Sequence, residues 1–164
     1  MLSETLQQAI NDQIKSEMDS AYLYLAMSAY LEGVHLPGAA RWMRVQSREE
    51  TSHAMKLFDY VLDRGGRVVL QAIEQPPATF ASMLDVFQQA LGHERKVTGM
   101  IHRLYDLATK ERDYATQVML QWFITEQVEE EKSAGDIVEQ LKVIGDQPAA
   151  LLFFDKQLAA REAE

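Results

Sequence analysis

The residues best suited to chemistry are acidic side chains placed where a helix should be apolar. The stretches Glu49-Glu50-Thr51-Ser52-His53 and Glu126-Gln127-Val128-Glu129-Glu130 each fall midway along a long helical pattern. Two further helical patterns carry Glu17 and Glu94 on their apolar faces. A buried carboxylate is unfavourable unless it is paired or binds a metal ion. Four carboxylates at one depth, beside a single histidine, therefore indicate a carboxylate-bridged pair of metal ions.

Glu50 and His53 are three residues apart, so they project from one helical face and can bind the same ion. Carboxylates with one imidazole suit iron, and Glu50 is our candidate for the ligand that bridges two ions. Each carboxylate taken singly has a simpler explanation, at the edge of an apolar face with its oxygens in water. A lone Glu-x-x-His pair also occurs by chance. The prediction depends on four carboxylates that coincide in long helices.

The neighbouring acidic residues allow two interpretations. Glu49, Glu126 and Glu129 form either a solvated acidic face or a third, looser cation site without histidine. Tyr24 lies two turns from Glu17 on the same face, as a hydrogen-bond partner of a ligand, an electron donor or a plain core residue. Trp122 lies either near the metals or in a core or interface. 

The remaining histidines are not expected to take part. His35 stands beside a loop proline, and His93 and His102 lie off the apolar faces, so we expect all three at the surface. Gly65-Gly66 is predicted to end the second helix, and the residues around it do not match a phosphate-binding loop. No arrangement of Ser, His and Asp indicates a hydrolytic triad.

Four long helical patterns and one short one must position these residues. We expect helices over about residues 3–32, 37–64, 82–110, 113–144 and 149–160, from the three/four spacing of apolar residues. Gly33 is expected to cap the first helix at its C-terminus, and Ser82 and Asp113 to cap the third and fourth at their N-termini. The expected inner faces comprise Leu6, Ile10, Ile14, Glu17, Ala21, Tyr24, Ser28 and Leu31; Met43, Gln46, Glu50, His53, Leu57 and Val61; Leu84, Phe87, Leu91, Glu94, Ile101 and Ala108; and Leu120, Phe123, Gln127, Glu130, Ala134, Ile137, Leu141 and Ile144.

Residues 65–82 form an unusually long connection between the second and third helices. A helix of about 28 residues is roughly 42 Å long. About 18 extended residues reach up to ~60 Å, which is enough to run back along the bundle. The second and third helices can then be parallel. This order predicts an all-α, ferritin-like four-helix bundle with a long crossover between the second (B) and third (C) helices and a short fifth C-terminal helix.

Composition limits the function classes. A chain of 164 residues with 47% hydrophobic residues is expected to form one domain over 1–164. The formal net charge of −9 disfavours nucleic-acid binding, and no apolar run approaches the ~20 residues that span a membrane. The chain has no cysteine, which excludes disulfides, zinc fingers and rubredoxin-type iron sites. No signal peptide is visible at Met1, so we expect a cytoplasmic protein.

Along essentially its whole length the chain resembles the bacterial non-haem ferritins of the ferritin-like di-iron carboxylate superfamily. The resemblance rests on Glu17, Tyr24, Glu49-Glu50-x-x-His53, Leu57-Phe58-Asp59-Tyr60, Glu94, Leu120-Gln121-Trp122, Glu126-Gln127-x-Glu129-Glu130, and Phe153-Phe154-Asp155-Lys156 before Leu158. It implies a ferroxidase that oxidises Fe(II) to Fe(III) with O₂ or hydrogen peroxide. It also implies iron storage as ferric mineral inside a hollow homo-oligomeric shell of 24 subunits.

The resemblance also implies a ligand set. Glu17, Glu50 and His53 would hold one iron, and Glu50, Glu94 and Glu130 the second, with Gln127 close by. The implied third site consists of Glu49, Glu126, Glu129 and Glu130.

Differences from related families narrow the group of proteins that this chain resembles. Bacterioferritins resemble this chain but carry a second Glu-x-x-His on the fourth helix, where this chain has Gln127-x-x-Glu130. They also have a haem-ligating Met where this chain has Thr51, so no haem is expected. Rubrerythrins need a cysteine-ligated iron domain. The miniature ferritins form a smaller shell with ligands between subunits and lack the fifth helix.

Two other function classes remain open. A di-iron oxidase or oxygenase acting on an organic substrate could use the same ligands, although no insertion offers a substrate pocket. A metal-free structural bundle would require Glu17, Glu50 and Glu94 to face solvent. The fifth helix favours a shell, because Phe153 and Phe154 are too apolar for a free tail and are expected to bury against neighbours.

Overall fold

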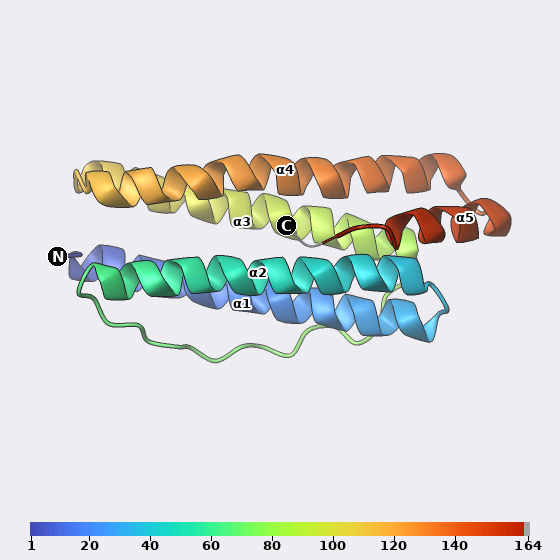
Figure 1. The fold of residues 1–164 in the computed structure, drawn as a ribbon, viewed down its shortest axis with the longest axis horizontal. Helices are drawn as coiled ribbons and strands as arrows, with labels where there is room; N and C mark the ends of the chain where they lie inside the picture. The colour runs from blue at the N-terminus through green and yellow to red at the C-terminus, as the bar shows by residue number, and fades with distance from the viewer. Residues whose placement is uncertain (163–164) are drawn as a thin grey trace.

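The chain forms an elongated bundle of helices in the computed structural model, which describes residues 1–162 (Figure 1). The described part contains five helices and no strand, as the sequence predicted. The helices are α1 Glu4–Gly33, α2 Pro37–Asp63, α3 Met83–Lys110, α4 Tyr114–Ile144 and α5 Pro148–Leu158. None of these helices is both long and apolar enough to cross a membrane.

The long helices pack as two antiparallel pairs, α1 with α2 and α3 with α4 (Figure 1). The segment that follows α2 runs back along the whole length of the α1–α2 pair before α3 begins. The helices α2 and α3 therefore point in the same direction, and the predicted crossover is confirmed. The short α5 lies at the end of the bundle where α4 finishes, and it contacts α2 and α4.

The N-termini of three long helices are capped by side chains. The Ser82 hydroxyl accepts the Asp85 amide at 3.1 Å and the Asp113 carboxylate accepts the Thr116 amide at 3.0 Å, as expected, while Ser3 caps α1. The expected C-cap at Gly33 is wrong. The helix continues through this glycine, and a hydrogen bond from the Leu36 amide to the Leu31 carbonyl places the left-handed residue at His35, with φ of 62°.

The N-terminus of α2 is capped from α5. Leu36, at the cap position, makes no capping side-chain bond. Instead the buried Asp155 carboxylate accepts the Gly38 amide at 3.0 Å and the Ala39 amide at 2.8 Å. A Cβ on Gly38 would lie 1.7 Å from the Asp155 carbonyl oxygen, so this close approach requires glycine. The carboxylate at the positive end of α2 thus fixes α5 to the bundle.

The apolar core is divided into two clusters. One, including Met43 and Phe87, fills the end near α5, and the other, including Ile14 and Phe123, fills the opposite end. The expected inner-face residues are buried, except that Leu84, Leu91 and Ile144 are half-buried beside the first cluster. The buried polar residues discussed next interrupt the core between these ends.

Candidate metal centre

A buried polar centre lies midway along the bundle, and each long helix contributes to it. Its side chains are between 1% and 6% exposed. We call these residues the buried centre: Glu17 from α1, Glu50 and His53 from α2, Glu94 from α3 and Glu130 from α4. The apolar positions before and after each of them bury the helix, so the carboxylate at the same face is drawn into the interior.

The buried centre contains two overlapping groups of potential metal ligands. Ligand atoms of Glu17, Glu50 and His53 all lie within 4.8 Å of one another, as do those of Glu50, Glu94 and Glu130. Glu50 belongs to both groups, and its Oε2 lies 3.7 Å from His53 Nδ1. Two adjacent groups of three ligands that share one carboxylate can hold two ions side by side, with Glu50 between them.

Burial makes ionised carboxylates unfavourable here. Burial raises the pKa of Glu17 well above its ordinary value, and the nearby Glu50 charge adds to this effect. Burial, followed by the charges of Glu94 and Glu130, does the same to the pKa of Glu50. Burial also raises the pKa of Glu94, and that of Glu130 to about 8. Glu130 therefore retains its proton near neutral pH, and a divalent cation can displace this proton on binding.

Three buried glutamines donate hydrogen bonds to the centre. Gln13 Nε2 donates to Glu17 Oε1 at 2.7 Å, and Gln127 Nε2 donates to Glu94 Oε2 at 3.1 Å. Gln46 Nε2 donates both to Glu50 Oε1 at 2.9 Å and to Glu130 Oε2 at 2.6 Å. A single amide thus ties together carboxylates from α2 and α4 and fixes their separation.

Gln13 and Gln46 are not among the residues predicted for this centre. Gln46 is predicted only on an inner face, and no role is predicted for Gln13. The usable signal was spacing, because each glutamine lies four residues before a predicted ligand, Glu17 or Glu50, on the same helical face.

Tyr24 lies beside the carboxylates of the buried centre. Its hydroxyl donates a hydrogen bond to Glu94 Oε1, and its ring is buried. Burial, followed by the charges of Glu94 and Glu50, raises the pKa of Tyr24 well above its ordinary value. Of the three roles considered for Tyr24, this geometry favours that of a hydrogen-bond partner to a carboxylate of the buried centre.

The surface position expected for His93 is wrong. His35 and His102 are exposed, but His93 is half-buried, with its Nε2 2.7 Å from the Ser20 hydroxyl. Its ring packs edge-on against Tyr24 at 5.9 Å. Burial lowers the pKa of His93 to about 4, and the charge of Lys96 contributes.

The residues Glu49, Glu126 and Glu129, which we call the acidic flank, are not brought together in one group. Ligand atoms of Glu126 lie within 4.8 Å of those of His53 and Glu130, and its Oε1 is 3.8 Å from His53 Nε2. Glu126, His53 and Glu130 thus form a third group of potential ligands, whereas Glu129 is exposed and lies outside all three groups found among the described residues. Glu49 forms an ion pair with Arg161.

Trp122 lies next to the centre at its edge. Its ring is 5.3 Å from the His53 ring, in an edge-on arrangement, and it is 38% exposed. Lys56 Nζ lies over this ring, 4.2 Å from its centroid. The Trp122 ring therefore contacts both the His53 imidazole and a cationic side chain.

Comparison with known proteins agrees with this geometry. A model of the ferritin-like domain matches residues 7–144. The bacterial non-heme ferritin of Bacteroides fragilis is 45% identical over 98% of this chain and 100% of its own length. That of Staphylococcus epidermidis is 40% identical over 98% and 97%. A crystal structure of an open pore ferritin from Archaeoglobus fulgidus superposes with a TM-score of 0.98 at 51% identity, covering 99% of this chain and 100% of that one. With these matches over nearly its whole length, the chain belongs to the ferritin family.

Proposed function

We propose that this protein stores iron: it oxidises Fe(II) to Fe(III) at the buried centre and deposits ferric mineral inside a hollow shell of 24 subunits. The observation that carries the proposal is the pair of three-ligand groups that share Glu50. Family membership supports iron storage independently of this geometry.

In the proposed reaction both irons are substrate. Glu17, Glu50 and His53 bind one Fe(II), and Glu50, Glu94 and Glu130 bind the other. The two ions supply one electron each, so that O₂ takes up two electrons and two protons to give hydrogen peroxide. With hydrogen peroxide as the oxidant, the same two electrons and two protons give two waters. A pair of irons thus avoids the one-electron reduction of O₂ to superoxide.

The ligand environment favours the ferric product. Hard carboxylate oxygens bind Fe(III) strongly, and binding displaces the proton that burial keeps on Glu130. The only histidine in either group is His53. We propose that a centre with so little imidazole releases Fe(III) onward instead of keeping it as a cofactor.

We further propose that the acidic flank serves iron in transit, together with Glu130. The closeness of Glu126 to His53 and Glu130 supports this role for Glu126. Glu129 is exposed, so in this proposal it attracts cations without completing the group.

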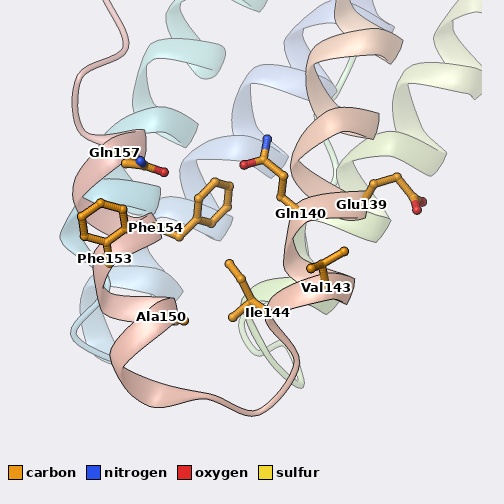
Figure 2. Close-up of a pocket in the computed structure, with 8 residues that line it drawn as sticks. All are labelled: Glu139, Gln140, Val143, Ile144, Ala150, Phe153, Phe154 and Gln157. Atoms are coloured by element: carbon orange, nitrogen blue, oxygen red, sulfur yellow. The ribbon is translucent and has the colours of Figure 1, made fainter.

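Assembly into a shell is supported by the surface of α5. Figure 2 shows a hollow of about 420 Å³ between α5 and the end of α4, lined by apolar side chains including Val143, Ile144 and Phe154. Phe153 is 65% exposed beside it. Exposed apolar groups this large are unfavourable in a single chain, so we propose that further copies of the chain cover them. Phe153→Glu, which leaves the Asp155 cap intact, should shift the assembled particle towards smaller species in sedimentation.

We also propose that residues 1–164 form a single domain and that the protein stores iron in the cytoplasm. An oxidase acting on an organic substrate would need an apolar cavity beside the buried centre. The hollow in Figure 2 lies at the α5 end, and no proposed ligand lines it. No specific observation therefore favours that alternative.

The proposal is tested by adding Fe(II) aerobically to the purified iron-free protein, then separating it by size and counting iron per particle. The expected result is a particle of about 24 subunits that holds far more than two irons per subunit. A small particle that saturates at two irons would indicate a di-iron oxidase. Absence of bound iron would contradict the metal centre itself.

A further inference from the structure

A C-terminal arginine folds back from the end of α5 onto α2. Arg161 Nη2 donates to Glu49 Oε2, and its Cζ lies 4.0 Å from the centroid of the Trp42 ring. Its side chain is only 20% exposed. An ion pair on one side and an aromatic face on another hold a planar guanidinium in one place, so Arg161 is a fixed positive charge.

This charge reaches the metal ligands as well as Glu49. Burial raises the pKa of Glu130 to about 8, and the Arg161 charge acts in the opposite direction. Glu49 immediately precedes Glu50, the carboxylate shared by both ligand groups. Arg161 therefore places a positive charge at the border between the acidic flank and the buried centre. A loosely held cation would place its positive charge at the same border.

Other arginines restrict where Arg161 can go. A hollow of about 480 Å³ beside α2 is lined by Arg161 and by Arg41, Arg44 and Arg48, with Glu32 as the acidic member of this lining. Like charges repel, so moving the Arg161 guanidinium away from Glu49 and towards these three arginines is unfavourable. The same three arginines also repel a cation that approaches Glu49 from that side.

We propose that Arg161 competes with a divalent cation for the Glu49 carboxylate, so that the C-terminal segment keeps cation binding at the acidic flank weak. A cation that binds Glu49 displaces the guanidinium, and the guanidinium returns when the cation leaves. Iron would then pass this position without being retained. This inference rests on the proposed function, because it assigns Glu49 to iron in transit.

The test uses Zn²⁺, which undergoes no redox change, titrated calorimetrically into the assembled iron-free particle. In Arg161→Gln the weak class of sites should bind Zn²⁺ about tenfold more tightly, the order of effect of losing a partly buried ion pair, while the tight class is unchanged. Arg161→Lys keeps a charge but loses the planar fork, and should fall between the two. Arg95→Gln is the matched control, since it removes an equal charge from a side chain that is 66% exposed and pairs with Glu131.

Tryptophan fluorescence tests the displacement itself. Zn²⁺ at saturation should change the emission of Trp42 as the guanidinium leaves its ring, and this component should be missing in both Trp42→Phe and Arg161→Gln. Equal weak-class affinity in the wild type and Arg161→Gln, or an unchanged Trp42 emission at saturation, would overturn the inference.

The two proposals fail in different ways. If the tight class disappears in Glu50→Ala but Arg161→Gln behaves as the wild type, the ferroxidase proposal stands and the competition is refuted. If the wild type has no tight class at all, the proposed function fails first, and this inference with it.

Discussion

The buried centre and the acidic flank both consist of glutamates, apart from His53 in the centre, but the surroundings of the two regions differ. The centre draws one carboxylate from each long helix, lies between two apolar clusters, and receives hydrogen bonds from glutamine amides. The flank draws its carboxylates from α2 and α4, lies nearer the solvent and includes an ion pair with Arg161. The carboxylates of the centre are buried, where a bound metal ion could offset their charges, whereas the flank is more exposed and its Glu49 pairs with an arginine.

The largest difference should appear in the rate of iron oxidation. Glu50→Ala removes the carboxylate shared by both ligand groups, and should slow oxidation of the first two Fe(II) per subunit by about two orders of magnitude or more. Glu129→Ala, the matched change in the flank, should alter this rate by no more than about twofold, because Glu129 is exposed. Stopped-flow absorbance of the ferric product measures both. If both variants lost oxidation rate to the same extent, the buried centre and the acidic flank would not differ in function.

The second prediction concerns the Gln46 amide, which donates hydrogen bonds to carboxylates on two helices. Gln46→Met preserves volume but removes the hydrogen bonds to Glu50 and Glu130, and should weaken tight Zn²⁺ binding by roughly 10- to 100-fold. Gln13→Met removes a bond to Glu17 alone and should have a smaller effect. Isothermal calorimetry on the iron-free protein makes the comparison. A larger loss in Gln13→Met would show that Gln46 does not set the ligand separation.

The third prediction concerns the stability of the iron-free protein. Glu17 Oε2 is buried without a hydrogen-bond partner among the described residues, and burial raises the pKa of this carboxyl. Glu17→Gln should therefore raise the free energy of unfolding by about 1–3 kcal/mol while it weakens metal binding. Glu129→Gln in the flank should change stability by less than about 0.5 kcal/mol. Denaturant titration measures the free energy of unfolding of each variant. A Glu17→Gln variant that is less stable than the wild type would contradict the claim that burying this carboxyl destabilises the iron-free protein.

The fourth prediction is a dependence of stability on pH, an effect that is spread over several pH units. Glu130 has a folded pKa of about 8 against an ordinary 4.5, so between these values the folded state holds a proton that the unfolded state has lost. Stability of the iron-free protein should therefore fall as pH rises from about 5 to 8, by at most about 1.4 kcal/mol per unit for one group.

Asp113 acts in a different pH range. The Arg64 guanidinium lowers its pKa to about 2, so its contribution is lost only as pH falls below about 4. Unfolding of the wild type and Glu130→Gln across pH 5–8 isolates the first effect, since the variant should show the shallower slope. Parallel curves would mean that Glu130 does not retain its proton.

The sequence predicted most of the fold and the centre because both depend on spacing. Apolar residues at three/four intervals located the long helices, and Glu17, Glu50, Glu94 and Glu130 fell on their inner faces. The length of the connection after α2 was enough to predict the crossover. The roles of these residues as ligands remain predictions.

Contacts between distant segments could not be read from periodicity. Asp155 caps α2 and Arg161 pairs with Glu49 only because α5 turns back onto α2, which no local pattern specifies. His93 was placed at the surface because its spacing lies off the inner face, but α1 brings Ser20 against it. The sequence left Glu129 either on a solvated acidic face or in a cation site, and its helical phase turns it to solvent.

The most direct test of the central claim is the position of metal in crystals loaded anaerobically with Fe(II), read from anomalous scattering at the iron edge. Our account predicts two strong peaks on either side of Glu50, one beside Glu17 and His53 and the other beside Glu94 and Glu130. Any peak at Glu49 or Glu126 should be weaker. Strong peaks confined to the acidic flank, or none in the buried centre, would contradict it.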